Sequence, residues 1–277
     1  VAQEESVAQD DGGAQRVNLS GKLRMLSQRV PAAACYLQNG VDVERSRAVL
    51  TGALAEFEQI VAGLEHGDME LGIPTAEERR RTLAGIAKLN ELWVPLRQDA
   101  NAILDGTGTP EHLASMASQS AEVLAVAQKL VVVISGQYAN QAELLQSDTM
   151  LIDVAGRQRM LSQRMSKNAC LASSGIASDV AIAELQGAHD TYHNSLFALY
   201  GGMQSAGINP PPTDEIEAAL GEVIARWGGL EPLVQQVLDG GALSSDEKAV
   251  LFNGANAMTG EMNTIVGMYS VASNLGD

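Results

Sequence analysis

The chain has 277 residues, enough for one large or two medium domains, and its 45% hydrophobic content is that of a globular protein. Aromatic residues make up only 4% while Ala, Leu, Gln and Glu are plentiful, which is typical of packed helices. The formal net charge of −16 argues against nucleic acid and anionic membrane surfaces as partners, because both would be repelled. No uninterrupted apolar run approaches the roughly 18–20 residues of a membrane span, so we expect no membrane insertion.

The N-terminal residues 1–13 are polar and are expected to form a flexible segment. The chain begins at Val1 and shows no apolar core of a signal peptide. An N-terminus left by removal of a signal peptide fits this start, and an arbitrary boundary fits it equally well.

One segment occurs twice. Gly21–Arg29 reads GKLRMLSQR and Gly156–Arg164 reads GRQRMLSQR, at an offset of 135 residues. Further matches follow the same order, namely Cys35 with Cys170, Gly40 with Gly175, Leu50 with Leu185 and, after one net deletion, Trp93 with Trp227. We therefore expect one unit duplicated over residues 14–137 and 149–277, with a connector over 138–148.

Each unit is predicted to contain four helices. Thr75 with Glu78 and Ser244 with Glu247 fit capping boxes, Thr109-Pro110 fits a helix start, and glycines mark the helix ends. The predicted helices are 14–38, 42–66, 75–104 and 109–136 in the first unit, and 149–173, 178–200, 213–239 and 244–273 in the second. Short loops between amphipathic helices predict an all-α fold of two tandem up-down-up-down four-helix bundles.

The repeated helix has two opposite faces. Its apolar seam, which must face the bundle core, consists of Leu19, Leu23, Leu26, Val30, Ala33 and Leu37. The opposite stripe holds Gly21, Arg24, Gln28 and Cys35 in the first copy, and Gly156, Arg159, Gln163 and Cys170 in the second. A glycine inside a helix is costly unless something approaches the backbone closely, and arginine offers a planar five-donor fork. This outward stripe therefore predicts a site for a small anion.

Local charge supports that interpretation. The basic residues are Arg16, Lys22, Arg24 and Arg29 in the first copy, and Arg157, Arg159, Arg164 and Lys167 against Asp153 in the second. A rival hypothesis treats the stripe as the packing seam of a protein–protein interaction module. Under that hypothesis the arginines pair with carboxylates and no anion pocket exists.

The pattern (N/D)-x-x-G-(K/R)-x-R-M-L-S-Q-R resembles the signature of the PilJ/NarX-type sensory domain, found in type IV pili methyl-accepting chemotaxis transducers and nitrate/nitrite sensor kinases. Asn18 fits the first copy, whereas Asp153 replaces the usual Asn in the second. The resemblance implies a periplasmic four-helix bundle that senses nitrate or nitrite. In the sensor kinases, two subunits bring their first helices together and hold the anion between paired arginines.

Carried over to this chain, the resemblance implies an internal pseudo-dimer in which Arg24 and Arg159 clamp the anion. Gly21, Gly156, Gln28 and Gln163 are the further expected ligand-binding residues. We expect a soluble periplasmic sensory or binding protein, with no enzymatic activity and no cofactor. Its expected partners are nitrate or nitrite and a membrane sensor or transporter protein. The alternative is a helical interaction module of a signalling or chemotaxis system that binds no ligand.

The two cysteines bear on how the bundles are arranged. If the first helices pack in parallel about a pseudo-twofold axis, Cys35 and Cys170 face each other and can form a disulfide, which an extracytoplasmic compartment favours. The alternative is two buried thiols preserved by duplication. A single long helix over 110–172 would instead place the bundles end to end, and the cysteine placement favours the side-by-side arrangement.

Other chemistry finds little support in the sequence. His189 and His193 are spaced i, i+4 on a predicted helix, which can hold a metal, but the sequence places no third ligand and we expect no metal site. The first copy has Glu58 at the position of His193 and nothing useful opposite His189. Ser27 and Ser162 have no His or Asp partner in the motif, so nucleophilic catalysis is not expected.

Overall fold

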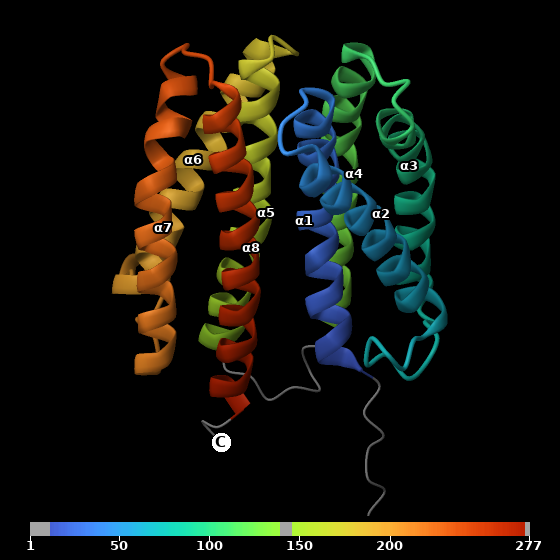
Figure 1. Ribbon diagram of the computed structural model, residues 1–277. Coiled ribbons are helices and arrows are strands. Elements are labelled where there is room, and N and C mark those ends of the chain that lie inside the picture. Colours follow the sequence, from blue (N-terminus) through green and yellow to red (C-terminus); the bar gives the residue numbers. More distant parts are fainter. Residues whose placement is uncertain (1–11, 139–145, 275–277) are drawn as a thin grey trace, which may run out of the picture.

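The computed structural model describes residues 12–138 and 146–274, and these residues form eight α-helices (Figure 1). The first unit consists of α1 (Gly13–Gln38), α2 (Val43–His66), α3 (Arg80–Leu104) and α4 (Pro110–Tyr138). The second consists of α5 (Gln146–Ser173), α6 (Ser178–Gly201), α7 (Asp214–Leu238) and α8 (Ser245–Asn274), with a short 3-10 turn between α6 and α7. The predicted all-α fold of two four-helix units is confirmed.

The two bundles lie side by side, with α1 and α5 in contact at the centre of the molecule (Figure 1). Within each bundle, the first helix packs on the second and the fourth, and the third packs on the fourth. The end-to-end alternative is wrong, because α1 packs directly on α5 and Cys35 and Cys170 form a disulfide with their Cα atoms 6.2 Å apart.

The predicted apolar seam forms the bundle core. Leu23, Leu26 and Val30 of α1 are fully buried, and the buried apolar residues form one continuous cluster through both bundles. The two tryptophans at equivalent repeat positions anchor this core. Trp93 stacks on Phe57 with ring centroids 3.6 Å apart, and Trp227 meets Tyr192 edge-on at 5.0 Å.

One predicted helix start is wrong. α3 begins at Arg80, not at Thr75. The intervening segment is fixed by tertiary contacts, since the Glu77 N–H donates to the Glu65 carbonyl at 2.9 Å and the Thr75 carbonyl accepts from Arg16. The buried Glu77 carboxylate also accepts from the Arg79 N–H at 2.9 Å, in place of the predicted cap. The capping box of Ser244 with Glu247 does form.

The segments expected to be irregular are described only in part. Residues 1–11 and 139–145 lie outside the described residues, so the expected flexible segment and connector stay predictions there. Gly12 and Gly13 are buried, and α1 begins at Gly13. A Cβ added at Gly13 would lie 2.8 Å from Cδ1 of Tyr138, so glycine is needed where the ends of α1 and α4 meet.

Helix α4 is long and apolar enough, by length and composition, to cross a membrane, although it holds no uninterrupted apolar run of that length. The core helix of a bundle meets the same criterion. In this structure α4 packs on α1 and α3. Its core-facing side is buried and consists of Leu113, Met116, Ser120, Val123, Ala127, Leu130 and Ile134.

Helices α1 and α5 run in parallel, so equivalent repeat positions face each other. Cys35 and Cys170 form a disulfide with their Cα atoms 6.2 Å apart. The Tyr36 hydroxyl donates to the Ser166 carbonyl at 3.1 Å, and the Arg29 guanidinium donates twice to Oδ1 of Asn256, at 2.9 and 2.8 Å. The two bundles are therefore held together by covalent, polar and apolar contacts.

The disulfide leads to a first prediction. Replacing Cys35 and Cys170 together by Ser should lower the free energy of unfolding by about 2–4 kcal/mol, because the bond closes a long loop in the unfolded chain. Differential scanning calorimetry of the oxidised protein and the variant measures this. Reduced wild type should match the variant, and a variant as stable as the oxidised protein would contradict the prediction.

Candidate functional site between the first helices of the two repeats

Two arginines at the same repeat position meet where α1 packs on α5. Arg24 and Arg159 are each 2% exposed. Gly21 and Gly156 lie one helical turn before them on the same faces. A Cβ added at Gly21 would lie 3.5 Å from Nη2 of both arginines, and one added at Gly156 would lie 3.7 Å from Arg24 and 3.5 Å from Arg159. The Nη2 atoms of both side chains thus come together against both glycines.

The first arginine is held by one helix of each repeat. Nη1 of Arg24 donates to Oε1 of Gln128 on α4 and to Oδ1 of Asp153 on α5, both at 3.2 Å. The second contact is also an ion pair. Asp153 is half-exposed and forms another ion pair with Arg157 at 2.8 Å.

The second arginine has the same arrangement with neutral partners. Nη1 of Arg159 donates to Oδ1 of Asn263 on α8 at 2.7 Å and to Oδ1 of Asn18 on α1 at 3.2 Å. Asn18 and Asp153 are repeat equivalents 135 residues apart, and so are Gln128 and Asn263, because α4 begins at Pro110 and α8 at Ser245, which restores that offset after the deletion. The site therefore has pseudo-twofold symmetry, broken by one charge.

That broken symmetry leaves positive charge uncompensated. No carboxylate among the described residues forms an ion pair with Arg159, whereas Arg24 has Asp153. Burial lowers the pKa of Arg24, and Asp153 opposes that shift. Burial, and then the charge of Arg24, lower the pKa of Arg159 to about 10. Burial is the main cause of both shifts, and the nearby carboxylates, Asp153 for Arg24 and Glu56 for Arg159, offset it only in part.

Several guanidinium donors also lack acceptors. No described residue accepts a hydrogen bond from Nη2 of Arg24 or of Arg159, and the buried Nε of Arg24 has no acceptor either. Among these atoms Nε of Arg24 is itself fully buried, and a buried donor without an acceptor costs free energy. Two planar forks with free donors suit a small oxyanion, which can accept hydrogen bonds from both.

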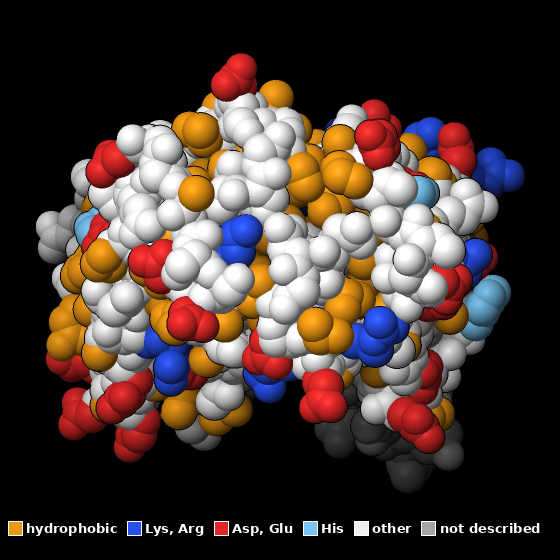
Figure 2. All heavy atoms as spheres, turned by 45° about the horizontal axis from the view of Figure 1, so that its top comes forward, with side chains coloured by type: hydrophobic (Ala, Val, Ile, Leu, Met, Phe, Trp, Pro, Cys, Tyr) orange, Lys and Arg blue, Asp and Glu red, His pale blue; other side chains and the backbone are white. Residues whose placement is uncertain are grey.

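The surface of the protein is otherwise acidic in character. Asp and Glu side chains are scattered over the face shown in Figure 2, as expected for a net charge of −16. The buried arginine pair is thus a local positive site within an acidic protein.

The predicted glutamines lie elsewhere. Nε2 of Gln28 donates to the Ser120 carbonyl on α4 at 3.3 Å, and Nε2 of Gln163 donates to Oγ1 of Thr259 on α8 at 2.8 Å. Each glutamine is turned toward the last helix of its own bundle, away from the arginine pair. The stripe of Gly, Arg, Gln and Cys was predicted to face outward from the bundle core. In the structure it is buried between the two repeats and does not face solvent.

The remaining basic residues fit the rival interpretation. Arg16 pairs with Glu77 at 3.7 Å and Lys22 with Glu56 at 3.2 Å. Lys167 pairs with Glu184 at 3.1 Å. These three charges are paired, whereas Arg29 and Arg159 donate only to neutral oxygens among the described residues, and Arg29 meets Asn256 rather than the arginine pair.

Gln128 and Asn263 are site residues that sequence reasoning missed. They lie on the last helices of the bundles, more than 100 residues from the arginines that they contact. Their common offset of 135 residues was the available signal, since both are polar residues on helices that otherwise pack on the core.

The serines of the motif have local roles. Oγ of Ser27 donates to the Arg24 carbonyl at 2.7 Å and Oγ of Ser162 to the Arg159 carbonyl at 3.0 Å. These bonds span one helical turn and use the hydroxyl hydrogens as donors to the backbone.

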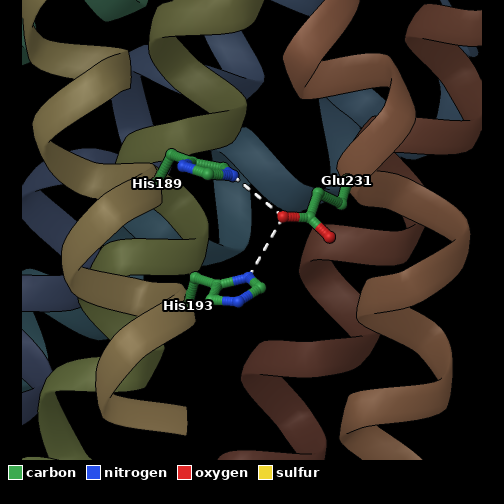
Figure 3. Close-up of side chains that lie close together, drawn as sticks. All are labelled: His189, His193 and Glu231. Carbon is green, nitrogen blue, oxygen red and sulfur yellow. Dashed lines mark hydrogen bonds and ion pairs between the residues drawn. The ribbon is translucent and has the colours of Figure 1, made fainter. Parts of the chain in front are cut away.

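A possible metal cluster lies outside this site. His189 and His193 of α6 meet Glu231 of α7, a third residue that the sequence did not place (Figure 3). The ring nitrogens and the carboxylate oxygen lie within 4.8 Å of one another.

Comparison with known proteins agrees with the repeat. The PilJ family, described as the N-terminal domain of type IV pili methyl-accepting chemotaxis transducers, matches residues 6–119 and again residues 142–249. A search of curated proteins finds no match. The two family matches correspond to the two bundles, so the resemblance inferred from the repeated motif is confirmed.

Proposed function

We propose that this chain, which belongs to the PilJ family of N-terminal domains of type IV pili methyl-accepting chemotaxis transducers, binds a small oxyanion between α1 and α5. The family is one of sensory domains that are typically not catalytic. The observation that carries the proposal is the meeting of two buried guanidinium groups whose Nη2 donors have no acceptor among the described residues.

The charges of the site favour a monovalent anion. Arg24 and Arg159 bring two buried positive charges, and Asp153 adds one negative charge, while Arg157, which shares Asp153, is exposed and screened by water. A single negative charge would complete the compensation, whereas a divalent anion would meet repulsion from Asp153. Nitrate and nitrite are small and planar and match the guanidinium forks, so we place them first.

We further propose a periplasmic location. PilJ sensory domains are usually extracytoplasmic, and the Cys35–Cys170 disulfide is consistent with an oxidising compartment.

A bound anion would draw Arg24 and Arg159 together and so fix α1 against α5. We propose that a membrane sensor or transporter protein binds this chain and responds to the altered packing of α1 on α5.

One observation favours the alternative function, an interaction module that binds no ligand. The Arg24–Asp153 ion pair is what a simple packing seam between the repeats requires. Arg159 does not fit that account, because only neutral oxygens accept its hydrogen bonds.

Calorimetric titration with sodium nitrate and sodium nitrite tests the proposal. The wild-type protein should bind one anion per chain, and sulfate should bind more weakly. Arg24→Ala and Arg159→Ala should each weaken binding at least tenfold, because each removes a charge-assisted donor, typically worth about 1.5–3 kcal/mol. No heat with the wild type would contradict the proposal and favour the interaction module.

Replacing Asp153 by Asn restores the symmetry with Asn18 and removes the competing carboxylate. We expect several-fold tighter binding of nitrate and a larger gain for sulfate, since the divalent anion suffers most from Asp153. The same titrations measure both. Asp179→Asn, which removes an exposed carboxylate of α6, serves as the control. Equal affinities in wild type and Asp153→Asn would contradict the charge argument.

Alanine substitution of Gly21 and Gly156 should change protein stability and nitrate affinity in opposite directions. Alanine at Gly21 and Gly156 is sterically tolerated by the protein, and each change should stabilise the helix by about 0.5–1 kcal/mol. The added methyl groups occupy the space beside the Nη2 atoms, so nitrate affinity should fall at least tenfold. Urea unfolding and calorimetry measure the two effects.

The matched control is Gly52→Ala on α2, where an added Cβ meets nothing within 4 Å. It should raise stability and leave nitrate affinity unchanged. Undiminished nitrate binding in the Gly21→Ala, Gly156→Ala double variant would show that the anion does not sit against these glycines.

A further inference from the structure

The second bundle brings two imidazoles and one carboxylate together between α6 and α7. Nε2 of His189 and Nδ1 of His193 each lie 3.0 Å from Oε1 of Glu231 (Figure 3). The two histidines are spaced i, i+4, so they project from one face of α6 toward the glutamate of α7. All three side chains are partly buried, with between 14% and 38% of each exposed.

The equivalent position in the first bundle holds an ion pair in place of this cluster. There Nε1 of Trp93 donates to Oε1 of Glu58 at 3.3 Å, and Arg97 forms an ion pair with the same oxygen at 3.0 Å. The equivalent residues in the second bundle are Trp227, His193 and Glu231, so the acid and the base have exchanged helices.

His189 is the residue that an exchanged ion pair does not explain. Its repeat equivalent is Leu54, a buried core residue. His193 and Glu231 alone would replace the ion pair of the first bundle. A second imidazole in place of a leucine adds a nitrogen ligand directed at the same carboxylate oxygen.

Trp227 and Glu231 both approach Nδ1 of His193, which has a single lone pair, and a cation bound to Nδ1 would take this lone pair from the Trp227 N–H. Nε1 of Trp227 donates to Nδ1 of His193 at 3.3 Å, which requires a lone pair on Nδ1. That lone pair then faces Oε1 of Glu231 at 3.0 Å, and two acceptors repel at this distance. Protonating Nδ1 satisfies Glu231 but turns two N–H groups toward each other.

His189 has the orientation that metal-bound histidines adopt. Its Nδ1 lies 3.0 Å from Oδ1 of Asp190. Donation from Nδ1–H to this carboxylate leaves the lone pair of Nε2 directed at the cluster. A carboxylate that orients the imidazole through its other nitrogen is the usual second partner of a metal-bound histidine.

We propose that Nε2 of His189, Nδ1 of His193 and Oε1 of Glu231 bind a divalent transition-metal ion of the zinc class. Tetrahedral zinc with ligands at about 2.0–2.1 Å places them about 3.3–3.4 Å apart. The two nitrogen–oxygen separations of 3.0 Å are close to this value and the two nitrogens lie within 4.8 Å of each other, so side-chain rotations accommodate the ion. Two imidazoles and one carboxylate favour zinc, copper or nickel over magnesium or calcium, and partial exposure leaves a coordination position open to solvent.

The test is calorimetric titration of the full chain with zinc chloride after treatment with EDTA. We expect one zinc ion per chain. His189→Leu, which installs the leucine of the first bundle, and Glu231→Gln should each lower the affinity at least tenfold. His66→Ala, which removes an exposed histidine elsewhere, is the control and should leave the affinity unchanged.

Cobalt absorption spectra provide a readout that needs no variant. Cobalt bound by nitrogen and oxygen ligands in the wild type should give visible bands that zinc removes. Absence of zinc binding to the wild type, or equal binding by wild type and both variants, would overturn the proposal. Because the cluster lies between α6 and α7, nitrate binding between α1 and α5 can fail or succeed independently.

Discussion

The parallel packing of α1 on α5 is the constraint on which the rest of the structure depends. It places equivalent residues opposite each other, which brings Cys35 to Cys170 near one end of the two helices and Arg24 to Arg159 near their middle. It also buries both faces of α1, because the opposite face already packs in its own bundle. The polar side chains of the motif must therefore find partners inside the protein, and the Nη2 groups of the two arginines find none among the described residues.

Duplication within one chain permits what a symmetric dimer cannot. In a dimer of identical subunits every substitution appears twice, whereas here each repeat can change alone. Asp153 opposite Asn18 changes the charge of the arginine site by one unit, and His189 in place of Leu54 adds an imidazole to one bundle only. Both proposed sites depend on this divergence, the first for its charge and the second for its ligands.

The fold could be predicted from the sequence because its signals are local and repeated. The apolar seam of α1, the glycine stops and the matching cysteines each follow from spacing along one helix. The failures came from contacts between distant residues. The start of α3 depends on Glu77 meeting Arg16 and Glu65. A helical wheel placed Gln28 on the arginine side, but it could not say which neighbouring helix would accept its hydrogen bond. Asn263 lies on α8 and Glu231 on α7, far in sequence from the residues that they contact, so no local motif contained them.

The proposed anion lies between Arg24 and Arg159, and a crystal structure of the protein soaked in sodium nitrate tests this most directly. We predict one nitrate between α1 and α5, with its oxygens about 2.7–2.9 Å from Nη2 of both arginines. Nitrate should lie against Gly21 and Gly156 without displacing Asp153 from Arg24. A structure at saturating nitrate with only water between the two guanidinium groups would contradict it.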